Sequence, residues 1–525
     1  MAPPLTITVF GGAAGSTADT GEIGGNKILV ETNEPKTWFL DFGLGFSRAG
    51  RFFDEFLQPR VAVGLRDHLR MGLIPPLEGI YRPDLCAHET DLLERYRQHP
   101  HYRRIERLDG VLLSHAHQDH NGHIGFLKRE VPIYTGLMTA LIGKAMQDLE
   151  SSSEFSYIAP KEPTSDGILK AASPAQRLGR PHYICETDEA ITRAFGALGE
   201  FFTTRPGPRT KFEPAPLHLE SGESKGIRFF RVDHSIPGSG AFAVKTPIGW
   251  IGYSGDLRLH GHSSWRTEKF AAELAALKPA LLIVEGTRLD DIAATKEPEV
   301  RDAAQEVAHR EKGLVIADFS ARNIERLRTF RDIAHDLGRR LVVTMKDAYL
   351  LQQMHVIDPK IPTPSEPELA ILRTQRASSY QWEKGLHETF DSHMVDSATI
   401  KRSPSEYILC LSFWDIPALI DIEPARGTFI YSASEAYDEE QRFDHQRLEN
   451  WLDYFGLTKV GGLPGAEKGP YHASGHIDGP GMKSVIETIN PGKILPVHSQ
   501  KLGWFEANFP GKIVSAPYGV PVTFG

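Results

Sequence analysis

Three imidazoles and one carboxylate fall within six residues of each other in the first quarter of the chain. The segment is His115-Ala116-His117-Gln118-Asp119-His120, and it follows a short apolar run at 110–113. On an extended loop, His115 and His117 project to the same side, and Asp119 and His120 reach a neighbouring position. Neutral imidazole suits zinc, and a carboxylate adds charge that helps to hold a second cation nearby. The spacing therefore predicts a metal site with room for two divalent ions.

Four further histidines and aspartates with potential for chemistry come later in the chain. His234 follows a predicted strand at 227–232, and Asp256 follows one at 250–253. His476 ends a His-Ala-Ser-Gly-His run, and His498 follows a predicted strand at 494–497. Metal ligands are commonly held at the ends of rigid elements, so we expect these side chains to join the same site.

The elements that must position these residues change character along the chain. Strands at 5–10, 27–31 and 38–41 predict a β-meander, because the glycine-rich turn near the start opens a strand and a dinucleotide loop would open a helix. From 281 onward, strands at 281–284, 314–317 and 340–344 alternate with helices at 298–312 and 322–337. That rhythm is typical of a parallel α/β layer. Residues 150–225 are interpreted as a surface excursion, and strands return after 461, including one at 512–514.

These patterns predict three segments. A first domain would occupy residues 1–285, an inserted domain 286–462, and a return to the first domain 463–525.

Composition excludes several classes of protein. The 525 residues are 40% hydrophobic and 24% charged with a net charge of −9, which excludes a disordered tail, a collagen, a coiled coil and a polycationic protein. A nucleic-acid enzyme is not excluded, because binding depends on local basic patches and on metal charge. The three cysteines form no CxxC pair, and no apolar run approaches the ~18 residues of a membrane span. We expect a cytoplasmic protein without a membrane partner.

The motifs together resemble a known superfamily. An HxHxDH string followed in order by His, Asp and His is similar to the ligand order of the metallo-β-lactamase superfamily. The inserted domain, the Ser-Gly-His run and the late Pro-Val-His run resemble its β-CASP nuclease branch. The GEIGGN string at 21–26 and the HSIP string at 234–237 resemble motifs of the ribonuclease J family. The resemblance implies an α/β fold, a metallo-β-lactamase αββα sandwich with an inserted parallel α/β β-CASP domain.

The same resemblance implies a ligand set. One metal would take His115, His117 and His234, the other would take Asp119, His120 and His498, and Asp256 would bridge them. Glu285 matches an acidic motif that supports the site, His476 matches a histidine that faces the scissile phosphate, and Asp41 matches a structural motif. The implied cofactors are two divalent ions, with zinc expected and manganese as the alternative.

The implied activity is hydrolysis of RNA phosphodiester bonds. We expect 5′→3′ exonuclease activity on single-stranded RNA in RNA processing or decay, with endonuclease activity left open. Asp119 would orient or deprotonate the nucleophile, and His476 would stabilise charge or protonate the leaving oxygen. Two metal ions would lower the pKa of water and clamp the phosphodiester.

Candidate substrate contacts have ordinary alternatives. His472 and Ser474 are candidates for phosphate contact, whereas packing and a turn cap are the plain interpretations. Ser320 and Asn323 open a helix, which is a ready anion site, and they resemble the segment of the family that contacts the RNA 5′ end. Arg326 lies in a basic run on that helix that would neutralise phosphates, although such a run is often only a solvated face.

Two other functions stay open. A dimetal hydrolase of a small ester, lactone or β-lactam would use the same ligands, but the inserted domain with His476 argues for a nuclease. A non-catalytic scaffold would not need seven intact ligand positions. A flavin-linked di-iron protein would need a carboxylate at His117. Only 27 residues follow His498, so we expect the C-terminal dimerisation domain of bacterial ribonuclease J proteins to be absent, and homodimerisation is open.

Overall fold

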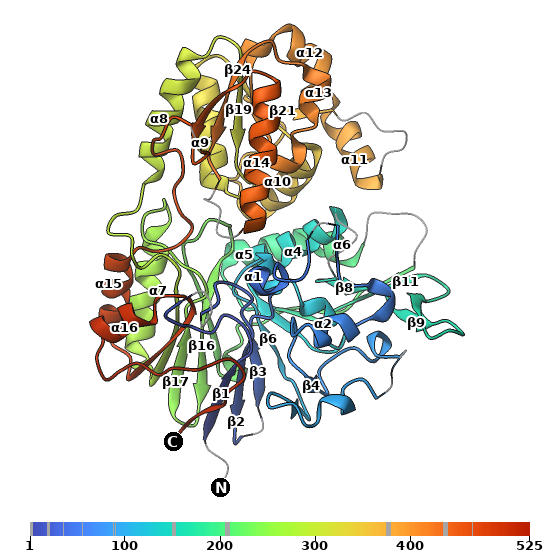
Figure 1. Ribbon diagram of the computed structural model, residues 1–525, viewed down its shortest axis with the longest axis vertical. Helices are drawn as coiled ribbons and strands as arrows, with labels where there is room; N and C mark the ends of the chain where they lie inside the picture. The colour runs from blue at the N-terminus through green and yellow to red at the C-terminus, as the bar shows by residue number, and fades with distance from the viewer. Residues whose placement is uncertain are drawn as a thin grey trace.

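The computed structural model has two bodies (Figure 1). It describes residues 4–17, 21–34, 36–54, 56–87, 89, 91–149, 154–204, 211–373, 380–433, 439–464 and 466–525. The lower body in the figure holds both chain ends, and the upper body is built around one parallel sheet.

The first sheet of the lower body begins with the expected meander. In spatial order it contains β14 (Leu217–Leu219), β12 (His182–Ile184), β7 (Ile133–Thr135), β6 (Gly110–Leu112), β3 (Thr37–Leu40), β2 (Ile28–Thr32), β1 (Leu5–Val9) and β27 (Val522–Phe524). Strands β1, β2 and β3 pair antiparallel, and β3, β6, β7, β12 and β14 continue in parallel. Side chains alternate across the sheet, so Ile28 and Val30 face one core while Leu29 faces another.

A second sheet packs on the first. It contains β15 (Ile227–Arg231), β16 (Gly240–Thr246), β17 (Gly249–Tyr253), β18 (Leu281–Gly286) and β26 (Lys493–Ser499). Phe242, Ile283 and Val497 share a buried cluster with Ile7 and Val30 of the first sheet. Helices α7 (Ser264–Ala276), α15 (Gly479–Ile489) and α16 (Leu502–Asn508) cover its outer face. The two sheets face each other across a common apolar core, as the αββα prediction requires.

The upper body is a parallel α/β layer. Its sheet runs β22 (Met394–Val395), β21 (Leu369–Leu372), β20 (Arg340–Val343), β23 (Tyr407–Cys410), β19 (Leu314–Asp318), β24 (Gly427–Tyr431) and β25 (Thr458–Gly461), with every pairing parallel. One face carries α8 (Glu297–Arg310), α9 (Ile324–Asp336), α10 (Met345–Ile357) and α11 (Gln381–Phe390). The other carries α12 (Ser397–Arg402), α13 (Ala418–Ile422) and α14 (Glu439–Tyr454). The predicted α/β class is confirmed, and the predicted domain boundaries fall close to the ends of β18 and β25.

The two bodies share a core along one seam. Helix α4 (Leu137–Leu149) of the lower body packs against α10 of the upper one. Ala116 and Ile236, which neighbour predicted metal ligands, belong to the same buried cluster as Leu351 of α10. The upper body is therefore packed directly against the segments that carry the histidines.

The structure differs from the sequence-based expectation in two places. Residues 154–219 are not a plain surface excursion, because β12 and β14 extend the first sheet and several other short elements form. These are β8 (Tyr157–Ile158), β9 (Lys161–Pro163), β10 (Leu169–Ala171), β11 (Gln176–Gly179), α5 (Glu189–Ala197), α6 (Gly199–Thr203) and β13 (Lys211–Glu213). Strand β12 pairs with β7 and β14, which lie 49 and 35 residues away in sequence, so local patterning does not reveal it. Residues 512–514 form a single bridge, Ile494 to Ile513, and no strand; residues 150–153 and 205–210 lie outside the described part.

Among the described residues, no helix is long and apolar enough to span a bilayer.

Candidate metal centre

The histidine segment is half loop and half helix. His115 and His117 lie on the loop after β6, and helix α3 (Gln118–Asn121) carries Asp119 and His120. An extended loop through 120 was therefore wrong, because His117 takes the extended N-cap position of this short helix. Glycines make room for α3: a Cβ on Gly43 would lie 1.7 Å from the Asp119 carbonyl oxygen, and one on Gly24 would lie 2.9 Å from Asp119 Cβ.

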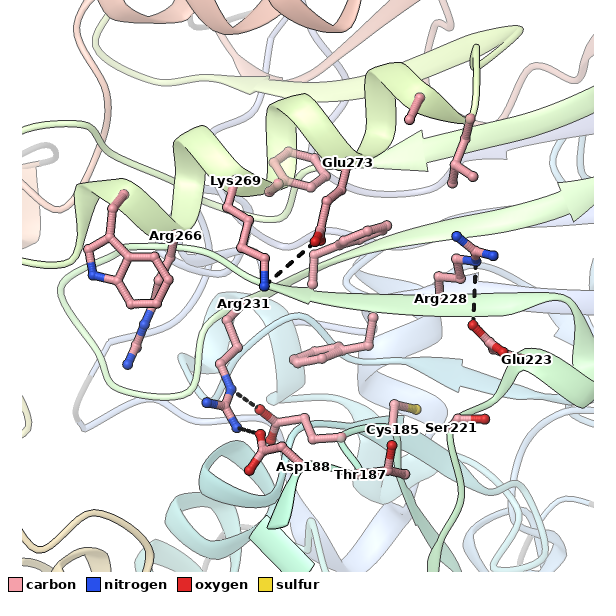
Figure 2. Close-up of a pocket in the computed structure, with 17 residues that line it drawn as sticks. Cys185, Thr187, Asp188, Ser221, Glu223, Arg228, Arg231, Arg266, Lys269 and Glu273 are labelled. Carbon is pink, nitrogen blue, oxygen red and sulfur yellow. Dashed lines mark hydrogen bonds and ion pairs between the residues drawn. The ribbon is translucent and has the colours of Figure 1, made fainter. Parts of the chain in front are cut away.

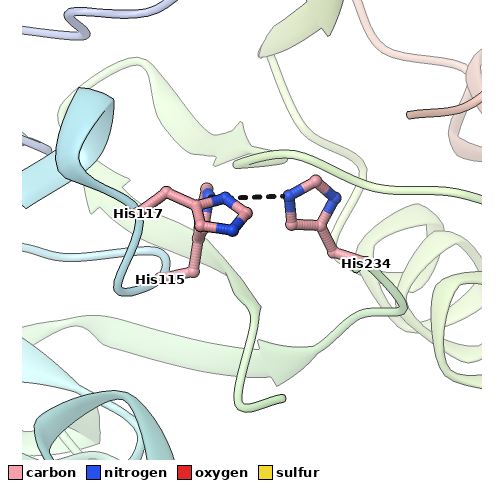
Figure 3. Close-up of side chains that lie close together, drawn as sticks. All are labelled: His115, His117 and His234. Carbon is pink, nitrogen blue, oxygen red and sulfur yellow. Dashed lines mark hydrogen bonds between the residues drawn. The ribbon is translucent and has the colours of Figure 1, made fainter. Parts of the chain in front are cut away.

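The first ligand group consists of three histidines (Figure 3). His117 Nδ1 lies 3.0 Å from His115 Nε2 and 3.3 Å from His234 Nε2. His234 lies on the loop between β15 and β16 of the second sheet, whereas His115 and His117 follow β6 of the first sheet. Both sheets therefore contribute to the site. The three nitrogens converge on one point, as the ligands of a single cation would.

The second group holds Asp119, His120, Asp256 and His498. His498 Nε2 lies 3.3 Å from Asp119 Oδ2, and His120 Nε2 lies 3.1 Å from Asp256 Oδ2. The same Asp256 oxygen lies 3.7 Å from His115 Nε2 and 3.9 Å from His234 Nε2. Asp256 therefore stands between the two groups, as expected for a bridging carboxylate.

Hydrogen bonds to the second ring nitrogen fix which nitrogen each histidine presents. His234 Nδ1 donates to the Gly475 carbonyl at 2.6 Å, and His498 Nδ1 lies 2.9 Å from the Thr287 hydroxyl. His120 Nδ1 lies 2.6 Å from Asp41 Oδ2. Such partners orient ligand rings and set their tautomers in metal sites. Each of these rings consequently turns Nε2 toward the centre.

Asp41 supports the second group through its hydrogen bond to His120. Its carboxylate also accepts the Ser114 backbone N–H and the Ser114 hydroxyl, each at 2.7 Å, and the Tyr253 hydroxyl at 2.5 Å. Three of the four donors reach Oδ2, so the oxygen next to His120 is already saturated with hydrogen bonds. This matches the structural role that the resemblance implies.

Burial and charge set the protonation of the centre. Burial lowers the pKa of His115 and His234 well below the usual value and that of His117 to about 4. Burial also works against a charged His120, but the carboxylates of Asp256, Asp119 and Asp41 raise its pKa well above the usual value. The neutral imidazoles of the first group and the two carboxylates of the second are both suited to binding divalent cations.

The donor set fits divalent metal ions. Asp256 Oδ1 and His120 Nε2 are buried and lack the geometry of a hydrogen bond. Buried polar atoms without partners are costly, and a cation in each group would satisfy them. Imidazole nitrogens and carboxylate oxygens are common ligands of zinc, and manganese accepts them too.

Glu285 and His476 form a pair beside Asp256. His476 Nδ1 lies 2.9 Å from Glu285 Oε2 and 4.0 Å from Asp256 Oδ2. Burial lowers the pKa of His476, but the Glu285 carboxylate outweighs it and raises that pKa to about 9. Glu285 also accepts the Leu257 N–H at 2.8 Å and the Thr287 hydroxyl at 2.7 Å. Glu285 thus links His476 to Leu257, beside Asp256, and to Thr287, which holds His498.

The other candidate substrate contacts differ in how far their side chains are buried. His472 is mostly buried with its Nδ1 3.0 Å from the Ser432 carbonyl, and burial lowers its pKa to about 4. The Ser474 hydroxyl accepts the His476 N–H at 3.1 Å, which is the turn role considered for it. Ser320 is exposed, and Asn323 caps α9 by accepting the Arg326 N–H at 3.2 Å.

Arg326 does not reach a substrate. Its side chain is 0% exposed and bonds Glu297 at 2.7 Å and the Ser432 carbonyl at 2.6 Å. The predicted phosphate contact is therefore corrected: this arginine points into the interior of the upper body, where Glu297 of α8 and the Ser432 and Tyr471 carbonyls hold it. Arg322 directly precedes the residue that caps α9, and its positive charge helps to lower the pKa of His117.

Two cavities lie near β15. One of about 550 Å³ is bounded by α7 and by residues 185–188, and most of its charges pair: Arg231 with Glu186 and Asp188, Arg228 with Glu223, and Lys269 with Glu273 (Figure 2). Arg266 also lines it. No predicted site residue lines it. A smaller one of about 100 Å³ adjoins His234 and is lined by Asn323, Glu325 and Arg328 of the upper body.

Sequence reasoning missed the residues that orient the ligands. Ser114, Thr287 and Tyr253 hold ligand rings or Asp41, and Arg258 bonds Asp233 and Glu325. Ser114 and Thr287 were findable, since each lies within two residues of a predicted site residue. Arg258 and Glu325 lie 67 residues apart, and no local pattern connects them.

Comparison with known proteins gives relatives over most of the chain. Ribonuclease J of Pyrococcus abyssi is 22% identical over 493 residues, covering 91% of this chain and 88% of that protein. Ribonuclease J of Thermus thermophilus is 24% identical over 444 residues, covering 82% of this chain and 63% of that protein. No model of a known protein family matches the chain.

One solved structure matches over its whole length. The crystal structure of a protein of unknown function from Enterococcus faecalis V583 has a TM-score of 0.63 at 20% identity, covering 99% of this chain and 100% of that one. This likeness shows a shared fold and nothing about activity. The sequence relatives, which cover 91% and 82% of the chain, and the two-sheet core that carries an inserted parallel layer make the chain ribonuclease J-like.

Proposed function

We propose that the chain is a divalent-metal-dependent ribonuclease that hydrolyses phosphodiester bonds in single-stranded RNA. The observation that carries the proposal is the pair of ligand groups with Asp256 between them: it belongs to the second group, and its Oδ2 lies 3.7 Å from His115 Nε2 and 3.9 Å from His234 Nε2 of the first. The similarity to proteins named ribonuclease J supports RNA as the substrate. Bound divalent ions would supply Lewis acidity and a water of lowered pKa at the shared carboxylate.

The residues of the chain divide the remaining work. His115, His117 and His234 would hold one ion, and Asp119, His120 and His498 the other, with Asp256 between them. The Asp119 side chain is 21% exposed while its neighbour His120 is fully buried. Asp119 is therefore the carboxylate that an attacking water can reach, and it would orient that water.

His476 is placed to serve the leaving oxygen. Glu285 engages its Nδ1 and favours the charged ring, which leaves Nε2 as the nitrogen available to a substrate. A protonated imidazole can stabilise negative charge on the phosphate or pass a proton to the oxygen that departs. Glu285 acts through His476 and is a positioning residue.

The substrate would enter between the two bodies. Ser320 is exposed and Asn323 caps α9, beside the small cavity that adjoins His234. A helix N-terminus offers free N–H groups and a favourable dipole to a phosphate. These residues support phosphate recognition near the start of α9. We propose 5′→3′ exonuclease activity from this end, with zinc or manganese as the ion.

The test uses two RNAs of one sequence, one with a 5′-monophosphate and one with a 5′-hydroxyl. Each is incubated with metal-loaded protein, and product lengths are followed over time. The control variants are His120→Ala, which removes a ligand, and His335→Ala, which removes an exposed histidine of α9. We expect mononucleotides from the monophosphorylated RNA with the wild type and His335→Ala, and no products with His120→Ala.

Other products would change the conclusion. Discrete internal fragments from both RNAs would replace the exonuclease with an endonuclease. No cleavage of either RNA by protein that holds two ions would overturn the ribonuclease proposal and direct the test to lactones and other small esters.

A further inference from the structure

Arg258 is a buried cation that bonds two carboxylates from different bodies of the molecule. Its Nε lies 3.2 Å from Asp233 Oδ2, and its Nη2 lies 3.3 Å from Asp233 Oδ1 and 2.6 Å from Glu325 Oε2. The side chains are 2%, 4% and 12% exposed for Arg258, Asp233 and Glu325. We call these three residues the Arg258 clasp.

Each end of the clasp is joined to a part of the candidate site. Asp233 directly precedes His234, and Arg258 lies two residues after Asp256. Glu325 is in the first turn of α9, two residues after the capping Asn323, and its Oε1 accepts the His262 N–H at 2.8 Å. The clasp therefore connects a ligand of the first metal group to the helix start at which we propose phosphate recognition.

The backbone around the clasp leaves it little freedom. The Arg258 N–H donates to the Asp233 carbonyl at 2.9 Å. A Cβ on Gly261 would lie 2.2 Å from Asp233 Oδ2 and 2.5 Å from Arg258 Nε, so the chain passes directly over the ion pair. A displacement of Glu325 would have to move Arg258, and with it the residue that precedes His234.

Stability alone is a weak reason for such an arrangement. Replacing a buried ion pair by well-packed apolar side chains is often neutral or stabilising, because desolvation offsets the attraction. One guanidinium between two carboxylates also leaves one negative charge uncompensated within the clasp. A fixed geometry between two separate segments is what the fork of an arginine provides, and a lysine does not provide it.

We propose that Arg258 is a positioning residue that couples the start of α9 to His234, so that RNA on the upper body and metal at the first group strengthen each other's binding. This inference rests on the proposed function. Coupling between two sites is reciprocal, so the factor by which RNA raises metal affinity equals the factor by which metal raises RNA affinity.

The first experiment measures metal affinity without RNA. Zn²⁺ is titrated into the metal-free wild type, Arg258→Lys and Glu325→Gln in competition with a chromophoric chelator. Glu325→Gln keeps the shape of the side chain, so it tests the clasp even if Arg258→Lys folds poorly. Loss of a residue that orients a ligand typically weakens metal binding about 10- to 100-fold. We expect that weakening for one of the two equivalents only.

The matched controls are Arg82→Lys and Glu154→Gln. Arg82 is also 1% exposed and bonds two carboxylates, Asp84 and Glu154, but none of the three lines the metal centre. These variants should lower the melting temperature without changing either zinc affinity. If Arg258→Lys and Glu325→Gln also lower the melting temperature without changing either zinc affinity, the clasp is merely structural and the inference is wrong.

The second experiment adds a short 2′-O-methylated oligoribonucleotide, and product analysis checks that it stays uncleaved during the titration. RNA should raise the affinity of the wild type for one zinc equivalent, and Glu325→Gln should abolish that increase. An equal increase in wild type and Glu325→Gln would overturn the coupling. A wild type that binds fewer than two ions would instead contradict the proposed function, so the two failures are distinguishable.

Discussion

Replacing Asp41 by asparagine should weaken metal binding at the second group more than at the first. Asp41 Oδ2 accepts three donors, from His120 Nδ1, the Ser114 hydroxyl and the Tyr253 hydroxyl, and Oδ1 accepts the Ser114 N–H. An amide oxygen has two lone pairs, and the amide nitrogen can accept nothing. Whichever way the amide turns, at least one of the four donors loses its acceptor, and the remaining bonds lose their ionic character.

The magnitude follows from the bond that orients His120. A hydrogen bond to a charged group contributes about 1.5–3 kcal/mol, and every 1.4 kcal/mol is about tenfold in an equilibrium constant. If His120 loses that bond, the affinity of the second group should fall about 10- to 150-fold. The first group has no direct bond to Asp41 and is linked to it only through the Ser114 hydroxyl, which lies 3.0 Å from His115 Nδ1. Its affinity should therefore fall less than that of the second group.

The assay is a competition titration of Zn²⁺ with a chelator, analysed for two equivalents. Asp188→Asn is the matched control, because Asp188 also accepts several donors, capping α5 through the Ile191 N–H and pairing with Arg231, but lies outside both ligand groups. An Asp41→Asn protein that loses affinity equally at both equivalents, or at neither, would refute the assignment of Asp41 to His120.

Three further predictions concern packing and protonation. Gly43→Ala should abolish zinc binding at the second group, because its Cβ would lie 1.7 Å from the Asp119 carbonyl oxygen, whereas Gly196→Ala, with nothing within 4 Å, should leave zinc titrations unchanged. Arg326→Ala should lower the free energy of urea unfolding by about 3–5 kcal/mol, because it leaves buried Glu297 unpaired; a loss below about 1 kcal/mol would contradict this. His182 is buried, and burial lowers its pKa to about 4. Only the unfolded chain then takes up that proton as pH falls from about 6.5 to 4, so stability should fall over this window by up to about 1.4 kcal/mol per pH unit. His182→Asn should show a correspondingly shallower decrease in urea titrations at stepped pH, and an unchanged slope would contradict the buried neutral ring.

The sequence predicts the ligands better than it predicts what holds them. His115, His117, Asp119 and His120 lie in one short segment, so their spacing alone indicates a metal. His234 and His498 join that segment only because the second sheet packs on the first. Their places at strand ends and the resemblance to known motifs are what predicted this. Their roles as ligands stay predictions until metal is measured.

Long-range partners explain what sequence reasoning missed. Strands β12 and β14 are three residues each, so local alternation has too few positions to reveal them. Strand β12 pairs with β7, 49 residues earlier, and with β14, 35 residues later. Arg326 was placed on the surface because its neighbours are charged, but the helix turns it inward to Glu297. Interactions of this kind depend on tertiary packing, which no local pattern encodes.

The most direct test of the central claim is a count of bound metal. Equilibrium dialysis against Zn²⁺, followed by elemental analysis, would be run on the wild type, His234→Ala and His498→Ala, one variant for each ligand group. The arrangement of two groups around Asp256 predicts two equivalents for the wild type and one for each variant. Less than one equivalent in the wild type, or two in both variants, would contradict a dinuclear centre at these residues.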